Sequence, residues 1–241
     1  SPLGFKLESQ ETVPSSGWKI EKVSDRKVRD EWKPLWGKRA VVEDHFNELV
    51  IDLVNPAGQP ERMQLVVRGY NDGFAFCYKI PDGKGPCVNV QSELTAYNFA
   101  GDYTAWFYNG ENHNIGPEKL TETDGTRLPV MTVKAGDKHY MAILEACLET
   151  GAPLVLQSKG GESLFSVASK PTSLSPGYTS AWRVVLYGTT PGVLTDSHLL
   201  ELLNPDPDSR YDFSWVKPGL AVWDWRINGA VWDGFTYGMS Y

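Results

Sequence analysis

Alternating apolar and polar residues, interrupted at short intervals by turn sequences, constrain the fold of this chain more than any other feature. In residues 41–54, apolar side chains from Leu49 to Leu53 occupy every second position, which is the period of a half-buried strand. The turn sequence NPAG follows, and the same period returns in residues 63–70. The sequence therefore predicts β-strands joined by tight turns.

A hairpin is predicted at Asp72-Gly73, because tight hairpin turns need backbone conformations that Gly, Asp and Asn tolerate. In the strand beyond it, three aromatic rings at alternate positions face one way, and Ala75 and Cys77 face the other. Large rings on one face and small groups on the other suit a sheet that packs against a second sheet.

The same rhythm runs through most of the chain. Further strands are predicted at residues 94–99, 104–108, 128–132, 140–145, 154–157, 163–168 and 182–187. Short loops rich in Gly, Pro, Ser and Asn separate them, which is typical of an all-β sandwich or barrel.

One helix is predicted, in the sequence LTDSHLLELLNP. Thr195 or Asp196 would cap its start, and Asn204-Pro205 would end it. Between these ends, leucines at positions 199, 200 and 203 form an apolar stripe.

Charge and hydropathy exclude some classes of function. The net charge is −7, with 23 Lys and Arg against 30 Asp and Glu, whereas phosphate binding needs a basic surface. Nucleic acid is therefore not an expected partner. No apolar run approaches the roughly 18 residues that a membrane span needs, and no signal peptide is visible.

The three cysteines, Cys77, Cys87 and Cys147, form no C-x-x-C pair, and their odd number leaves at least one without an internal partner. A bridge between Cys77 and Cys87 across a turn is one reading. Free, mostly buried thiols are the favoured one.

Nucleotide-binding and hydrolase motifs are missing: no P-loop, Rossmann glycine pattern, H-E-x-x-H or G-x-S-x-G is present. The chain does combine 9 Trp with many carboxylates, and proteins hold sugars with rings and acids. Core packing explains the same aromatic residues equally well. Trp32 and Trp36 could form an aromatic wall, with core packing as the default.

The end of the chain reads as a separate piece. NPDPDSRYD, within residues 204–212, contains two Pro and three Asp, so it is predicted to be a linker. The aromatic stretch AVWDWRINGAVWDGFTYGMSY, residues 221–241, lies beyond it. It is either the last strand of a finished core or the first part of a further domain.

Six strings carry a resemblance to a known family. They are SPLGF at 1–5, EWKPLWGKRAVVEDHFNEL at 31–49, VVRGYNDGFAFCY at 66–78, ILEACL at 143–148, AWRVVLYG at 181–188 and VKPGLAVWDWR at 216–226. Together and in this order they resemble the N-terminal region of glycoside hydrolase family 97, a bacterial family of α-glucosidases and α-galactosidases.

The resemblance implies a fold and a domain order. Residues 1–204 would be an antiparallel β-supersandwich similar to galactose mutarotase, with its first strands outside this chain. Residues 205–215 would be a linker, and 216–241 would begin a catalytic (β/α)₈ barrel. The expected partners are that catalytic domain and, through it, an α-linked oligosaccharide. The expected location is periplasmic or extracellular.

The resemblance also implies roles for individual residues. The catalytic carboxylates would lie beyond Tyr241, so no residue of this chain is assigned as general acid, base or nucleophile. Family members bind calcium near the substrate, and the string ILEACL makes Glu145 the candidate ligand. Asp224 and Trp223 would lie near the mouth of the barrel as substrate-binding residues.

Arg183 is the remaining candidate from the resemblance. It is predicted to pair with a carboxylate at the domain joint or, less favourably, to contact substrate. A calcium ion needs six to eight oxygen ligands, so Glu145 alone is expected to bind it poorly. The alternative function is a β-sandwich that binds carbohydrate without catalysis.

Overall fold

A computed structural model of the chain describes residues 4–7, 17–56, 60–83, 86–110, 114–149, 151–168 and 172–220. Contacts divide the chain into two units, Ser1–Pro205 and Asp206–Tyr241. In the second unit, residues 206–220 are exposed and form turns without strands or helices. Among the helices described, none has the length and apolar character that a membrane crossing requires.

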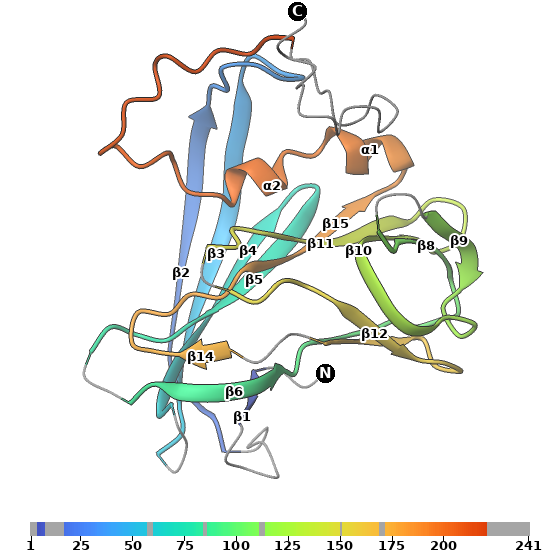
Figure 1. The fold of residues 1–241 in the computed structure, drawn as a ribbon, viewed down its shortest axis with the longest axis horizontal. Helices are drawn as coiled ribbons and strands as arrows, with labels where there is room; N and C mark the ends of the chain where they lie inside the picture. Colours follow the sequence, from blue (N-terminus) through green and yellow to red (C-terminus); the bar gives the residue numbers. More distant parts are fainter. Residues whose placement is uncertain are drawn as a thin grey trace, which may run out of the picture. The chain divides into compact units, whose positions relative to one another are not determined.

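The first unit is built from two antiparallel sheets (Figure 1). The larger sheet has twelve strands, and its neighbours follow the order β2 (Lys19–Trp32), β3 (Val42–Val54), β4 (Arg62–Tyr70), β5 (Gly73–Lys79), β15 (Trp182–Gly188), β11 (Tyr140–Ala146), β10 (Asp124–Lys134), β12 (Leu156–Lys159), β13 (Leu164–Val167), β7 (Ala96–Asn98). Strand β8 (Thr104–Tyr108) pairs with β10, and β9 (Asn114–Lys119) pairs with β8. The smaller sheet has the order β1 (Phe5–Leu7), β6 (Val88–Glu93), β14 (Thr172–Leu174).

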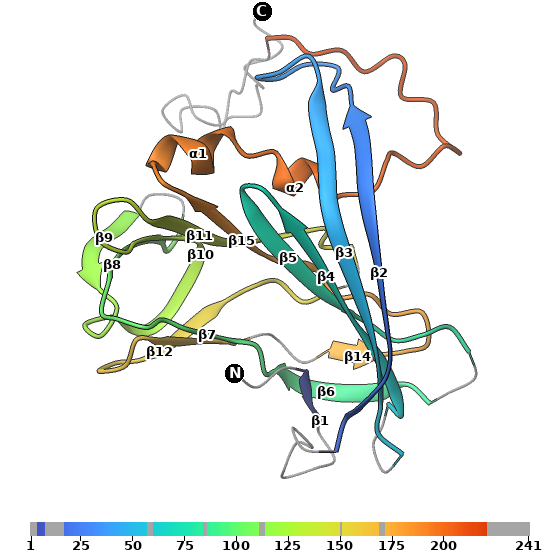
Figure 2. The ribbon, with the colours of Figure 1, turned by 180° about the vertical axis from the view of Figure 1, so that it is seen from behind.

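Strand β10 lets the larger sheet fold over on itself. Its first residues pair with β12, whereas its later residues pair with β11 on one side and β8 on the other. Figure 2 shows β7, β8, β10 and β12 enclosing one end of the unit. Inward side chains of these strands and of β13 form a core that includes Phe107, Met131, Leu156 and Phe165.

Two further cores lie on opposite faces of the strands β4, β5 and β15. On one face, Met63 and Tyr78 pack against Val90 and Leu174 of the smaller sheet. On the other face, small side chains of the larger sheet pack under Leu199 and Leu203, the first residue and the C-cap of the second of two short helices. The sheet is therefore covered by strands on one side and by a helical segment on the other.

The predicted hairpin at residues 70–73 is confirmed. Tyr70 pairs with Gly73, and Asn71 and Asp72 form the two-residue connection. A Cβ at Gly73 would lie 2.4 Å from the carbonyl oxygen of Val185, so this position needs glycine for close approach. Beyond it, Ala75 and Cys77 face the helical segment, and the rings of the same strand face the smaller sheet.

The predicted helix is wrong at its start. The structure has two short helices, α1 (Pro191–Asp196) and α2 (Leu199–Leu202), with a break at Ser197. Pro191 lies in the first turn of α1, where a missing N–H costs no hydrogen bond, and it starts the helix earlier than the leucine stripe suggests. The predicted end is confirmed: Asn204 donates to the Leu200 carbonyl and accepts from the Cys147 N–H.

Two open questions from the sequence have clear outcomes. All three cysteines are free thiols, and Cys77 is buried whereas Cys87 is exposed, so there is no bridge between them. The default of core packing is wrong for Trp36, which lies in the β2–β3 connection and is 73% exposed. Trp32, the last residue of β2, is half-buried.

Glu48 of β3 joins three neighbouring strands through ion pairs. It is buried, with Arg26 Nε 2.6 Å from its Oε1 and Arg68 Nε 2.8 Å from its Oε2. The Arg68 guanidinium also lies over the rings of Phe46 and Trp182, at 4.4 and 4.9 Å. Burial opposes ionisation, but the two hydrogen bonds outweigh it and lower the pKa of the Glu48 carboxyl.

Glu48 should therefore contribute stability that depends on pH. A carboxyl whose pKa is lowered by folding stabilises the protein above its unfolded value, about 4.5, and loses this contribution as the pH falls through the folded pKa. Glu48→Gln should lower the free energy of unfolding by about 1–3 kcal/mol near neutral pH. This difference from the wild type should shrink on acidification below the unfolded value, as measured by urea denaturation. Exposed Glu162→Gln is the control, and a gap that stays constant in acid would contradict the prediction.

Candidate functional site

Arg183 lies at the centre of the candidate site, in the interior of the larger sheet. It is on β15, where it pairs with Glu145 of β11 on one side and with Phe76 of β5 on the other. Only 1% of Arg183 is exposed. A guanidinium buried this deeply requires carboxylate partners, because an isolated charge in the interior is strongly unfavourable.

Two carboxylates and a carbonyl satisfy the Arg183 guanidinium. Its Nε and Nη2 donate to Oε1 and Oε2 of Glu93 at 3.1 and 2.5 Å, a bidentate arrangement. Nη1 donates to Oε2 of Glu145 at 2.8 Å, and Nη2 also donates to the Ala152 carbonyl at 3.1 Å. Burial opposes the charge, yet these contacts with Glu93 outweigh it and raise the pKa of the guanidinium. We call Arg183, Glu93 and Glu145 the arginine cluster.

Glu145 is held on one side only. Its Oε2 accepts from both Arg183 and the backbone N–H of Leu154, the latter at 2.6 Å. Its Oε1 accepts no hydrogen bond within the described part of the chain. The side chain is 11% exposed, and burial raises the pKa of this carboxyl above its ordinary value. One oxygen thus fixes the orientation of the carboxylate.

Two tyrosines surround the arginine cluster. Tyr78 is buried, and its hydroxyl bonds to the Thr95 hydroxyl at 3.0 Å and accepts from the Gly4 N–H. The Tyr97 hydroxyl is buried and has no hydrogen-bond partner in the described residues. Burial raises the pKa of both phenols, so both remain neutral beside the charged cluster.

The predicted site residues have different outcomes. The structure brings Arg183 and Glu145 into direct contact within one domain. Glu145 forms an ion pair with Arg183, and its side chain stays partly exposed. Trp223 and Asp224 lie outside the described residues. Glu93 is not predicted from the sequence, because it ends a strand, β6, whose alternating pattern is ordinary and contains no local signal for a site. Only the pairing of β1, β6 and β14 beneath β5 places it near Arg183.

No group of three or more His, Cys, Asp or Glu side chains suited to a metal ion occurs in the residues that the structure describes. Glu145 can offer one or two oxygens to a cation, whereas Ca²⁺ takes six to eight. The arginine cluster is therefore at most one side of a metal site.

Comparisons with known proteins assign the first structural unit, Ser1–Pro205, to a family. The sequence profile of the glycosyl-hydrolase 97 N-terminal family matches residues 1–205. This chain belongs to that family. The match ends where the first structural unit ends, at Pro205. The predicted all-β fold class is confirmed.

Two curated relatives of this family 97 chain are α-galactosidases. The retaining alpha-galactosidase of Bacteroides thetaiotaomicron is 24% identical over 93% of this chain, and the probable retaining alpha-galactosidase of Streptomyces bingchenggensis is 27% identical over 95%. The aligned regions are 39% and 36% of those proteins. The chain thus spans well under half the length of either relative.

Solved structures give the same fold. A family 97 enzyme from Pseudoalteromonas sp. strain K8, in complex with acarbose, superimposes with a TM-score of 0.78 at 25% identity. The match covers 90% of this chain and 34% of that one. A variant of a family 97 enzyme from the same strain has been solved in complex with panose. This family 97 domain is therefore similar to about a third of a larger enzyme.

Proposed function

We propose that this chain is the N-terminal domain of an α-glycosidase, an α-glucosidase or α-galactosidase, in which it supports the catalytic domain and contributes Glu145 as a calcium ligand. The observation that carries the proposal is the asymmetry of Glu145. Its Oε2 is fixed by Arg183 and Leu154, and its Oε1 has no partner among the described residues. Membership of the family supports the enzymatic context.

The charge of the arginine cluster suits this role. With both carboxylates ionised, one guanidinium and two carboxylates sum to +1 − 2 = −1. Glu93 takes the bidentate side of Arg183, so the surplus negative charge falls on Glu145. Oxygen ligands are what Ca²⁺ prefers, and Glu145 fits as one of them. When bound, calcium supplies positive charge beside the substrate, and the remaining ligands come from outside the described residues.

Catalytic acids are not assigned to this chain. Hydrolysis of a glycosidic bond needs two carboxyl groups that can exchange protons or attack the sugar. Glu93 and Glu145 both form ion pairs with Arg183, and these pairs occupy the carboxylates in a structural role. We therefore expect the chain by itself to release no nitrophenol from p-nitrophenyl α-glucoside or α-galactoside. Robust turnover would contradict this assignment.

Calcium binding tests the role of Glu145. The chain alone should bind Ca²⁺ more weakly than about 1 mM in a calorimetric titration, since it offers too few oxygens. Joined to a family 97 catalytic domain, the wild-type chain should support calcium-dependent hydrolysis. Glu145→Gln should raise the calcium concentration required at least about tenfold, because losing a charged ligand costs on the order of 1.4 kcal/mol or more.

The control for this experiment is Glu118→Gln, which alters a carboxylate paired with Arg127 at 3.6 Å on another part of the domain. It should leave the calcium requirement unchanged. Because burial raises the pKa of Glu145, the calcium requirement of the wild type should increase on acidification sooner than for an ordinary glutamate. Equal calcium requirements for Glu145→Gln and the wild type would overturn the proposed ligand.

A further inference from the structure

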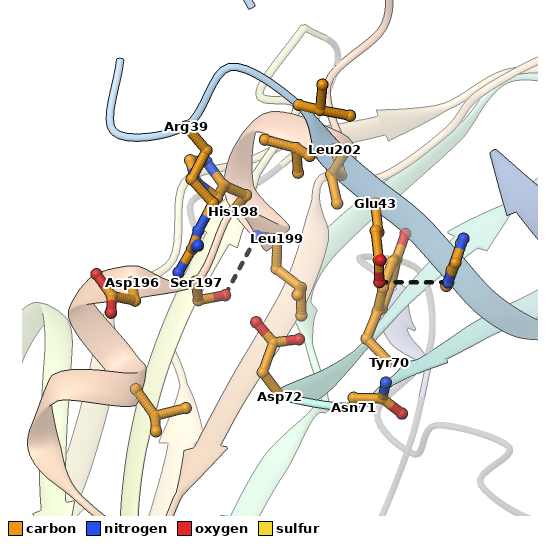
Figure 3. Close-up of a pocket in the computed structure, with 14 residues that line it drawn as sticks. Arg39, Glu43, Tyr70, Asn71, Asp72, Asp196, Ser197, His198, Leu199 and Leu202 are labelled. Atoms are coloured by element: carbon orange, nitrogen blue, oxygen red, sulfur yellow. Dashed lines mark hydrogen bonds and ion pairs between the residues drawn. The ribbon is translucent and has the colours of Figure 1, made fainter. Parts of the chain in front are cut away.

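A second polar site lies in a cavity of about 580 Å³ within the first structural unit. Figure 3 shows it enclosed by the start of β3, the β4–β5 turn and the segment that joins α1 to α2. Its volume is in the range of small-molecule sites, roughly 300–1,000 Å³. None of its lining residues belongs to the arginine cluster.

Two side chains of this cavity have buried polar atoms that lack partners. His198 is 8% exposed, and neither of its ring nitrogens has a hydrogen-bond partner in the described residues. Its nearest carboxylate, that of Glu201, is 3.6 Å from Nδ1, too far for a hydrogen bond. The buried hydroxyl of Tyr70 also meets no hydrogen-bond geometry within the described residues, although it lies beside the Asp44 carboxylate and the Arg68 guanidinium. Because buried polar groups are nearly always paired, both call for a ligand or a bound solvent molecule.

Charged side chains line the open side of the same cavity. Asp72 of the β4–β5 turn lies between Asp196 and Tyr70 in Figure 3, and the Glu43 and Arg39 side chains are exposed nearby. Apolar side chains complete the wall, namely Val193, Leu199 and Leu202. The site thus presents acceptors, donors and a hydrocarbon surface together.

These groups select a class of ligand. Three carboxylates against one guanidinium disfavour an anion. A cation provides no hydrogen-bond acceptor, so it would leave the Tyr70 hydroxyl and a ring N–H of His198 without one. A sugar hydroxyl both donates and accepts, and it can therefore satisfy carboxylates, imidazole and phenol at once. The C–H face of a pyranose suits the leucine and valine wall.

We propose that this cavity binds one pyranose unit of a neutral α-linked saccharide. His198 and Tyr70 hydrogen-bond its hydroxyls on the buried side, and Asp72 and Asp196 accept hydrogen bonds on the open side. The inference rests on the proposed function, which makes α-linked saccharides the sugars that this protein meets. It adds a place where the domain itself holds them.

Titration calorimetry of the 241-residue chain tests the inference with two probes, panose as an α-glucoside and melibiose as an α-galactoside. At least one should bind with a Kd on the order of 1 mM. Tyr70→Phe removes only the unpartnered hydroxyl, and His198→Leu removes both unpartnered nitrogens. Each should weaken binding about fivefold or more, the equivalent of one lost hydrogen bond. His198→Leu should not lower the melting temperature, because neither ring nitrogen makes a hydrogen bond among the described residues, and Tyr70→Phe should lower it only slightly, through the lost interaction with Asp44 and Arg68.

Matched controls lie outside the cavity. Tyr211→Phe alters an exposed tyrosine of the second unit, and His139→Ala alters an exposed histidine that bonds to Tyr187. Both should leave saccharide affinity unchanged. No binding of either sugar up to about 50 mM would overturn the inference, as would binding that neither Tyr70→Phe nor His198→Leu weakens. If calcium dependence through Glu145 holds while no sugar binds, the cavity inference alone fails and the proposed function stands.

Discussion

Arg183→Ala should lower the free energy of unfolding by about 3–5 kcal/mol, because removing one partner of a buried ion pair leaves the other charges without compensation. The variant would leave the Glu93 and Glu145 carboxylates without the cation they share, inside a core where Arg183 is 1% exposed. It would also remove the donor to the Ala152 carbonyl. Urea denaturation measures the loss, which is a large part of the stability of an ordinary domain.

A graded series makes this prediction specific. Arg183→Lys keeps the charge but loses the planar fork that bonds both oxygens of Glu93, so it should fall between the wild type and Arg183→Ala. The control, Arg210→Ala, removes an exposed arginine paired with Asp208 in the second unit and should leave stability unchanged within error. A loss below about 1 kcal/mol for Arg183→Ala would contradict the role of the arginine cluster.

Local patterns predict the fold well where strands are half-buried. Residues 63–70 and 74–78 alternate cleanly, and β4 and β5 confirm both. They predict poorly where burial is absent. Strand β2 is exposed along nearly its whole length and rich in charge, so it carries no alternating signal, and its pairing with β3 alone makes it a strand. The predicted strand 94–99 is confirmed only over the three residues of β7, and β6, which ends at Glu93, is not predicted.

The candidate site shows the same limit. Sequence strings point to Glu145 and Arg183 separately, and β11–β15 pairing then places them opposite each other. Glu93 comes from the other sheet, which is distant in sequence, so only tertiary structure can reveal it. His198 lies within the predicted helix. The break at Ser197 instead leaves its ring buried in a cavity, where neither nitrogen has a hydrogen-bond partner among the described residues, an outcome that helix periodicity cannot anticipate.

Phe165→Ala should lower the free energy of unfolding by about 3–5 kcal/mol, the range for emptying a large aromatic site in a core. Phe165 of β13 is fully buried, with the rings of Phe107 and Phe99 at 5.6 and 6.4 Å. The same core holds Leu154, whose N–H donates to Glu145. Urea denaturation with the wild type as reference measures the loss.

Two control variants separate the effect of a cavity from the general effect of losing a phenylalanine. One makes a smaller change at the same site, and the other truncates an exposed phenylalanine. Phe165→Leu keeps most of the volume and should cost clearly less, whereas Phe213→Ala, at a residue 47% exposed in the second unit, should cost little. Equal losses for Phe165→Ala and Phe213→Ala would contradict the position of this core.

The same substitution should also affect the proposed calcium ligand. Leu154 belongs to this core and its N–H holds one oxygen of Glu145, so a void left by Phe165→Ala should loosen the carboxylate that we propose as a ligand. Phe165→Ala should then also raise the calcium requirement of the joined enzyme, whereas Phe213→Ala should not.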